Sequence, residues 1–185
     1  MSSKIYILLW VMIFVSSCNG NLKIRKEVEF MQSCPINMES CNNGICFSGG
    51  TDTLYHYTMK SPYTLVIYVD SLSCTQCFIT NLIEYKECIE DFNRLGAESV
   101  IIFEPKNKQI KETASLLKSF AYPFMTIVIK DAQFSATNPH LSSNPALRCF
   151  LLNRNKDVVI VGNPVRNSKI RNLMQAILIT GDEHE

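Results

Sequence analysis

The sequence has no excess of either charge. Its 185 residues contain 18 Lys and Arg against 17 Asp and Glu, which gives a formal net charge of +1. A protein that binds nucleic acid normally presents a basic surface to the phosphates. The balance gives no electrostatic reason to expect nucleic acid as a partner, and we set that class aside. The hydrophobic fraction of 46% is enough to fill the core of one globular domain.

The sequence also begins without a hydrophobic run long enough to cross a membrane. The run from Ile5 to Val15 follows Lys4 and is well short of the roughly 20 apolar residues that a spanning helix needs. It ends on Ser16-Ser17-Cys18, which resembles the lipobox of bacterial lipoproteins. We therefore expect residues 1–17 to be a signal peptide and Cys18 to be lipidated, which would anchor the protein in the bacterial cell envelope. The alternative is an ordinary cleaved signal peptide, and in both cases the domain is exported.

Histidine is scarce, with three residues, whereas cysteine is frequent, with eight. Cys34, Cys41 and Cys46 have no nearby His and no C-x₂-C spacing, so they do not complete a zinc site, and we expect neither a metal nor an organic cofactor. Disulfides persist outside the cytoplasm, so we expect a local disulfide among these three, with the pairing left open. Without Cys18 the number of cysteines is odd, so at least one thiol stays free or pairs only transiently.

Residues 62–185 have the regular pattern of one α/β domain. Residues 18–61 are polar and rich in turn residues, and we expect them to form a tether and an irregular or β-hairpin extension. Apolar β-branched runs predict strands, and apolar residues spaced by three and four predict helices. The predicted elements are a strand at 64–69, a helix through 78–92, a strand at 99–103, a helix at 108–120, a strand at 124–129, a hairpin of 150–152 with 158–161, and a helix at 168–179. This β-α-β-α-β-β-α order predicts a central mixed sheet with helices on both faces.

Cys74 and Cys77 form a Cys-x-x-Cys where the first predicted strand meets the first predicted helix. A helix N-terminus carries partial positive charge and unpaired N–H groups, which favour a thiolate. Thiol-disulfide exchange needs an exposed thiolate and a second thiol that resolves the mixed disulfide. We expect Cys74 to be the exposed attacking thiol and Cys77 to be the resolving thiol, one helical turn deeper. The alternative is a static structural disulfide between the two.

From about Pro62 to Ile179 the chain resembles the thioredoxin superfamily, in particular exported, membrane-tethered redoxins of the alkyl hydroperoxide reductase and TlpA types. The resemblance rests on the strand before Cys74-Thr75-Gln76-Cys77, on the segment Tyr122 to Phe134, and on the segment Phe150 to Pro164. The last segment is similar to the Phe-Leu-Ile-Asp-x-x-Gly-x-x-Val hairpin that follows the cis-proline of such proteins. The resemblance implies a thioredoxin-like fold and disulfide exchange with envelope proteins and with an unidentified electron donor or acceptor.

The chain departs from the family pattern around the cysteine pair. Leu147 stands at the usual place of the cis-proline, two residues after Pro145. Tyr68 stands at the usual place of a buried carboxylate, and Asp70 is the closest acid. Cys149 is either an auxiliary thiol or a small buried residue on a strand. Asp70, Pro145 and Cys149 are therefore the candidate auxiliary residues of the site.

Two other functions stay open. Peroxiredoxins carry a Pro-x-x-x-Thr-x-x-Cys motif, and the corresponding positions before Cys74 are Ile67 and Ser71. The hydroxyl is kept and the proline is not, so a thiol peroxidase ranks second among the enzymes. The other function is a binding or assembly module that uses a thioredoxin-like fold and in which the cysteines are only structural.

Overall fold

The strand that leads to the cysteine pair lies in the interior of the sheet, with a strand on either side. A computed structural model describes residues 22–53 and 58–181; the predicted signal peptide and Cys18 lie outside this part of the chain. β3 (Tyr63–Val69) pairs in parallel with β4 (Glu98–Phe103) and antiparallel with β6 (Cys149–Asn153). All residues of β3 after Tyr63 are buried, because both faces of the sheet are covered.

The sheet has seven strands in the order β2-β1-β5-β4-β3-β6-β7. β4 pairs in parallel with β5 (Met125–Val128), and β6 forms the predicted antiparallel hairpin with β7 (Val158–Val161). β1 (Ile45–Ser48) and β2 (Thr51–Thr53) form a second hairpin, and β1 pairs antiparallel with β5. Of the irregular segment or β-hairpin expected in the N-terminal extension, the structure has the hairpin, which is continuous with the main sheet. Part of the segment expected to be a tether is instead a helix, at 22–31.

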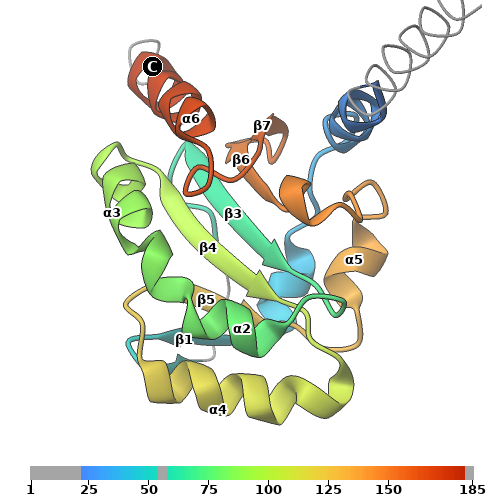
Figure 1. The fold of residues 1–185 in the computed structure, drawn as a ribbon, viewed down its shortest axis with the longest axis vertical. Coiled ribbons are helices and arrows are strands. Elements are labelled where there is room, and N and C mark those ends of the chain that lie inside the picture. Colours follow the sequence, from blue (N-terminus) through green and yellow to red (C-terminus); the bar gives the residue numbers. More distant parts are fainter. Residues whose placement is uncertain (1–21, 54–57, 182–185) are drawn as a thin grey trace, which may run out of the picture.

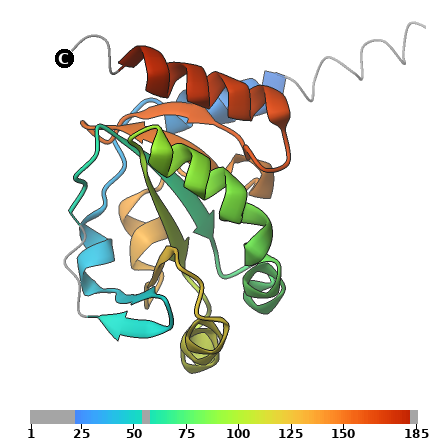
Figure 2. The same cartoon turned by 90° about the vertical axis from the view of Figure 1, so that its left-hand side faces the viewer.

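Helices cover both faces of the sheet, as the sequence predicted (Figure 1 and Figure 2). One face packs against α2 (Thr75–Thr80), α3 (Lys86–Arg94), α4 (Ile110–Phe120) and α6 (Ser168–Gly181). The other face packs against the helix at 22–31, the 3₁₀ turn η1 (Glu39–Asn43) and α5 (Gln133–Thr137). Within the described residues no helix combines the length and hydrophobicity needed to cross a membrane.

The long helix predicted after the cysteine pair is divided at Asn81. α2 ends there, the 3₁₀ turn η2 (Leu82–Tyr85) follows, and α3 begins at Lys86. The Asn81 side chain donates a hydrogen bond from Nδ2 to the carbonyl oxygen of Cys77, at 3.0 Å. Asn side chains compete in this way with the helical hydrogen-bond pattern. The apolar spacing fitted one helix because both segments bury the same face.

Candidate active site

Cys74 and Cys77 form a disulfide at the junction of β3 and α2, with a Cα–Cα distance of 5.3 Å. β3 and β4 point toward α2, so the pair lies at the carboxyl end of the parallel strands (Figure 1). Cys74 is the N-cap of α2, and its Sγ accepts the backbone N–H of Cys77 at 3.3 Å. Both cysteines are exposed, including Cys77, which we had expected to lie one helical turn deeper. The helix N–H distinguishes them instead, because it would stabilise a thiolate on Cys74.

The disulfide lies between two hollows of the surface. One, of about 260 Å³, is bordered by Phe78, Asn81, Tyr85 and Arg166. The other, of about 90 Å³, is bordered by residues at the start of α4 and by Glu112 within it. Beside them the side chain of Leu72 is 80% exposed. A polypeptide can therefore approach the two sulfurs from several directions.

Asp70 lies next to the pair but is engaged by Arg148. Arg148 Nη1 lies 2.5 Å from Asp70 Oδ1, and both side chains are buried. Arg148 directly precedes β6, and its carbonyl oxygen accepts the N–H of Tyr68 at 2.8 Å. Sequence analysis missed Arg148. Its position immediately before a strongly apolar strand was the only sign that its side chain would be buried.

Tyr68, where the resemblance leads one to expect a buried carboxylate, is paired with a carboxylate from the residue that follows β4. Its hydroxyl donates to Glu104 Oε2 at 2.6 Å, and Glu104 is only 2% exposed. Burial, together with the carboxylate, raises the pKa of Tyr68, so its hydroxyl stays protonated. Glu104 Oε1 also accepts the backbone N–H of Phe134 at 2.7 Å and that of Ser135 at 3.2 Å. A buried carboxylate therefore lies next to β3. Its role is to accept hydrogen bonds from backbone N–H groups in the first turn of α5.

Neither Pro145 nor Cys149 borders the hollows beside the Cys74–Cys77 disulfide. Pro145 begins a 3₁₀ turn, η4 (Pro145–Leu147), and its peptide bond is trans. The peptide bond of Leu147, at the usual cis-proline position, is trans as well. Cys149 is buried at the start of β6, and burial raises the pKa of its thiol, with a further contribution from nearby Cys88. A buried, protonated thiol is a poor nucleophile, which favours the structural interpretation of Cys149.

The local disulfide expected among Cys34, Cys41 and Cys46 is absent. Cys34 is an exposed thiol and Cys41 is a buried one, and neither is bonded to another cysteine. For Cys34 and Cys41 the expectation was wrong because proximity in the sequence does not bring these two thiols together: Cys41 is buried in the core and Cys34 stays at the surface. In residues 22–53 and 58–181, no three His, Cys, Asp or Glu side chains are grouped so as to hold a metal ion.

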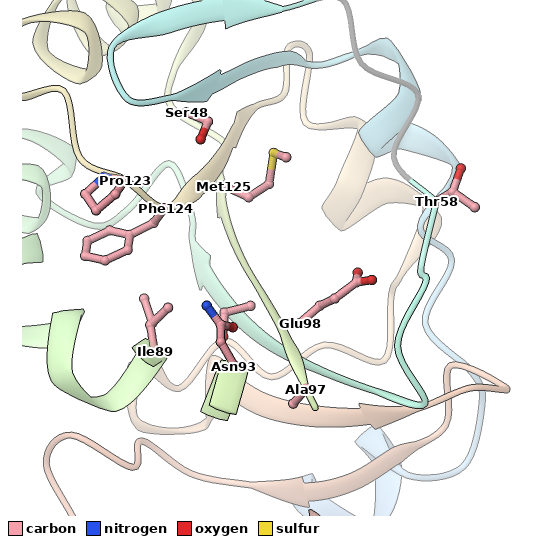
Figure 3. A pocket seen from close by; sticks show the side chains of 10 residues that line it. Ser48, Thr58, Ile89, Asn93, Ala97, Glu98, Pro123, Phe124 and Met125 are labelled. Carbon is pink, nitrogen blue, oxygen red and sulfur yellow. The ribbon is translucent and has the colours of Figure 1, made fainter. Parts of the chain in front are cut away.

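A separate hollow, of about 390 Å³, lies at the opposite end of the parallel strands (Figure 3). Ile89 and Asn93 of α3 border it on one side, Phe124 and Met125 border it on another, and Glu98 lies at the start of β4. Glu98 Oε1 accepts the backbone N–H groups of Lys60 and Ser61, so this carboxylate fixes the chain that leads to β3. None of the residues that border this hollow is a cysteine.

The strand order and the place of the cysteine pair identify the architecture. Parallel β3, β4 and β5 alternate with helices, an antiparallel hairpin and a helix follow, and the Cys-x-x-Cys opens the first helix. The fold is thioredoxin-like. No protein-family model matches the chain, and no curated protein sequence matches it either.

Several solved structures have a similar arrangement. A thioredoxin-like protein from Porphyromonas gingivalis is 13% identical with a TM-score of 0.47, over 73% of this chain and 85% of that one. Peroxiredoxin Q from Xanthomonas campestris is 14% identical with a TM-score of 0.49, over 80% and 96%. The thioredoxin domain of a thiol-disulfide oxidoreductase from Bacteroides vulgatus is 12% identical with a TM-score of 0.45, over 64% and 81%.

Proposed function

We propose that this protein is a thiol-disulfide oxidoreductase that acts through Cys74 and Cys77 in the bacterial cell envelope. The observation that carries the proposal is the exposed disulfide at the N-terminus of α2, in which Cys74 Sγ accepts a helix N–H. A purely structural disulfide does not need to be accessible to other molecules, so the exposure of both sulfurs favours exchange. The support for export, and for a lipid anchor at Cys18, is the sequence of residues 1–18.

The exchange uses the two thiols in turn. The Cys74 thiolate attacks one sulfur of a client disulfide, which forms a mixed disulfide and releases the other client sulfur as a thiolate. Cys77 then attacks Cys74 Sγ, which releases the second client thiolate and restores the Cys74–Cys77 disulfide. The client gains two electrons and the pair loses two; the same steps in reverse oxidise a client dithiol. An electron donor or acceptor of the envelope resets the pair.

A Cys77→Ser variant, expressed with its native leader, tests the proposal. Without the resolving thiol, Cys74 should stay bonded to client proteins, and these adducts should dissociate when a reductant is added. Cys74→Ser/Cys77→Ser is the matched control and should form none. If Cys77→Ser forms no more adducts than the double variant, the exchange function is wrong and a binding module with structural cysteines is favoured. Faster oxidation of Cys74 to a sulfenic acid by peroxide than of exposed Cys34 would instead favour the peroxidase.

A further inference from the structure

The buried ion pair of Asp70 and Arg148 contacts Ser73, the residue before Cys74. The side chain of Arg148 is 7% exposed and that of Asp70 is 13% exposed. Two buried charges must be paired, since an isolated one would lose its hydration without compensation. Asp70 follows the last residue of β3, and Arg148 precedes the first residue of β6, so the pair joins the ends of two adjacent strands.

The same carboxylate oxygen organises the loop before Cys74. Asp70 Oδ1 accepts the Leu72 N–H at 3.3 Å, the Ser73 N–H at 3.0 Å and the Ser73 hydroxyl at 2.7 Å. Arg148 Nη1 also lies 3.1 Å from Ser73 Oγ, and its Nη2 donates to the carbonyl oxygen of Ser143 at 2.6 Å. Because Ser73 is the residue before Cys74, the ion pair fixes the approach of the chain to the attacking sulfur.

The N–H and hydroxyl donors of residues 72 and 73 need a hydrogen-bond acceptor at Asp70. A negative charge on Asp70, however, disfavours the thiolate form of Cys74. A carboxylate near a thiol disfavours the thiolate, because like charges repel most strongly where water is excluded. Arg148 cancels this charge. Asp70 and Arg148 contact Ser73, the residue before Cys74. The charged residues in the two hollows beside Cys74 are Arg166 and Glu112, which are exposed and have opposite signs. A substitution in the buried pair should therefore change the electrostatic potential at Cys74 more than a substitution of either exposed residue.

We propose that Asp70 and Arg148 are a positioning pair for the attacking thiol, in which Asp70 holds the loop of residues 71–73 and Arg148 neutralises that carboxylate. The inference rests on the proposed role of Cys74 in exchange. Asp70 Oδ1 receives its donors from the loop and from the guanidinium group, so this oxygen serves to hold the loop.

The test is the pH dependence of Cys74 alkylation in the fully reduced protein, followed by mass spectrometry of the Cys74 peptide. Arg148→Met leaves the carboxylate unneutralised and should raise the pKa of Cys74 by about one, which slows its alkylation at pH 6 roughly tenfold. Asp70→Asn leaves the guanidinium charge and should lower the pKa of Cys74, which speeds alkylation at pH 6. Arg148→Lys keeps the charge and should restore most of the wild-type rate.

Shifts of the Cys74 pKa in opposite directions in Arg148→Met and Asp70→Asn support the positioning pair. A loss of loop order alone would shift the pKa in the same direction in both variants. Shifts of the same sign, or no shift, overturn the inference. If Arg148→Met does not fold, Asp70→Asn alone decides, since a raised or unchanged pKa of Cys74 overturns the inference. Arg25→Gln, which removes an exposed Arg–Glu pair, is the control and should leave the rate unchanged. Alkylation of Cys74 does not require disulfide exchange, so the two proposals can fail separately. If the pKa shifts are opposite but the protein has no reversible disulfide couple, the positioning pair is supported and the proposed function is refuted.

Discussion

The hydrogen bond from Tyr68 to Glu104 should contribute measurably to stability. Tyr68→Phe removes the hydroxyl that lies 2.6 Å from Glu104 Oε2 and changes little else in volume. Hydrogen bonds to a buried charged group are worth about 1.5–3 kcal/mol. Glu104 keeps the N–H groups of Phe134 and Ser135, so it remains partly satisfied and the loss should not exceed that range. The free energy of unfolding should fall by about 1.5–3 kcal/mol, and Tm should fall by roughly 3–12 °C.

Urea denaturation followed by circular dichroism measures this loss. Tyr122→Phe is the matched control, because the Tyr122 hydroxyl makes only a long, exposed bond of 3.5 Å to the Thr80 carbonyl oxygen; its loss should stay below about 0.5 kcal/mol. A double-mutant cycle with Glu104→Gln should give a coupling energy of about 1 kcal/mol or more. If Tyr68→Phe is as stable as Tyr122→Phe, the carboxylate does not depend on Tyr68 and our account of the buried site is wrong.

Three further predictions concern residues outside the site. Iodoacetamide should label Cys34 in the native oxidised protein but should label Cys41 and Cys88 only in denaturant, because burial raises their pKa to about 12 and about 11; native labelling of either would contradict this. Burial lowers the pKa of His140, so the unfolded chain takes up the proton first as pH falls below about 6.5, and stability should drop. The urea midpoint of His140→Gln should fall less between pH 7.5 and pH 5.5 than that of the wild type, and equal losses would refute the role of this ring. Gly50→Ala should destabilise by about 1–2 kcal/mol because Gly50 has a φ of +80°, and a midpoint equal to wild type would show that the turn tolerates a side chain.

The sequence was sufficient to predict the fold because its periodic segments are strong. The apolar run that became β3, the amphipathic stripe that became α2 and α3, and the hairpin of β6 and β7 were all predicted within a few residues. The division at Asn81 was not, since it depends on one hydrogen bond from a side chain to the backbone. α5 was missed as well, because a five-residue helix has too few turns to show periodicity, and a capping carboxylate from a distant strand supports it.

The site was predictable only in part. The place of Cys74 and Cys77 followed from the change from strand to helix spacing, but the surroundings depend on contacts between residues far apart in the chain. Asp70 and Arg148 are separated by 78 positions, so no local pattern could pair them. The same holds for Tyr68 and Glu104, which meet across β3 and β4. Proximity in the sequence was equally misleading for Cys34 and Cys41, because one thiol is exposed and the other is buried.

The most direct test of the central claim is the redox equilibrium of the purified domain. The protein is equilibrated in glutathione buffers of graded ratio, its thiols are trapped, and the state of the Cys74 and Cys77 peptides is measured by mass spectrometry. We expect a reversible two-electron transition of this pair between roughly −120 and −300 mV, the range of known exchangers and labile disulfides. A pair that stays oxidised throughout that range, or that is not restored on reoxidation, would contradict the account and leave the disulfide as a structural element.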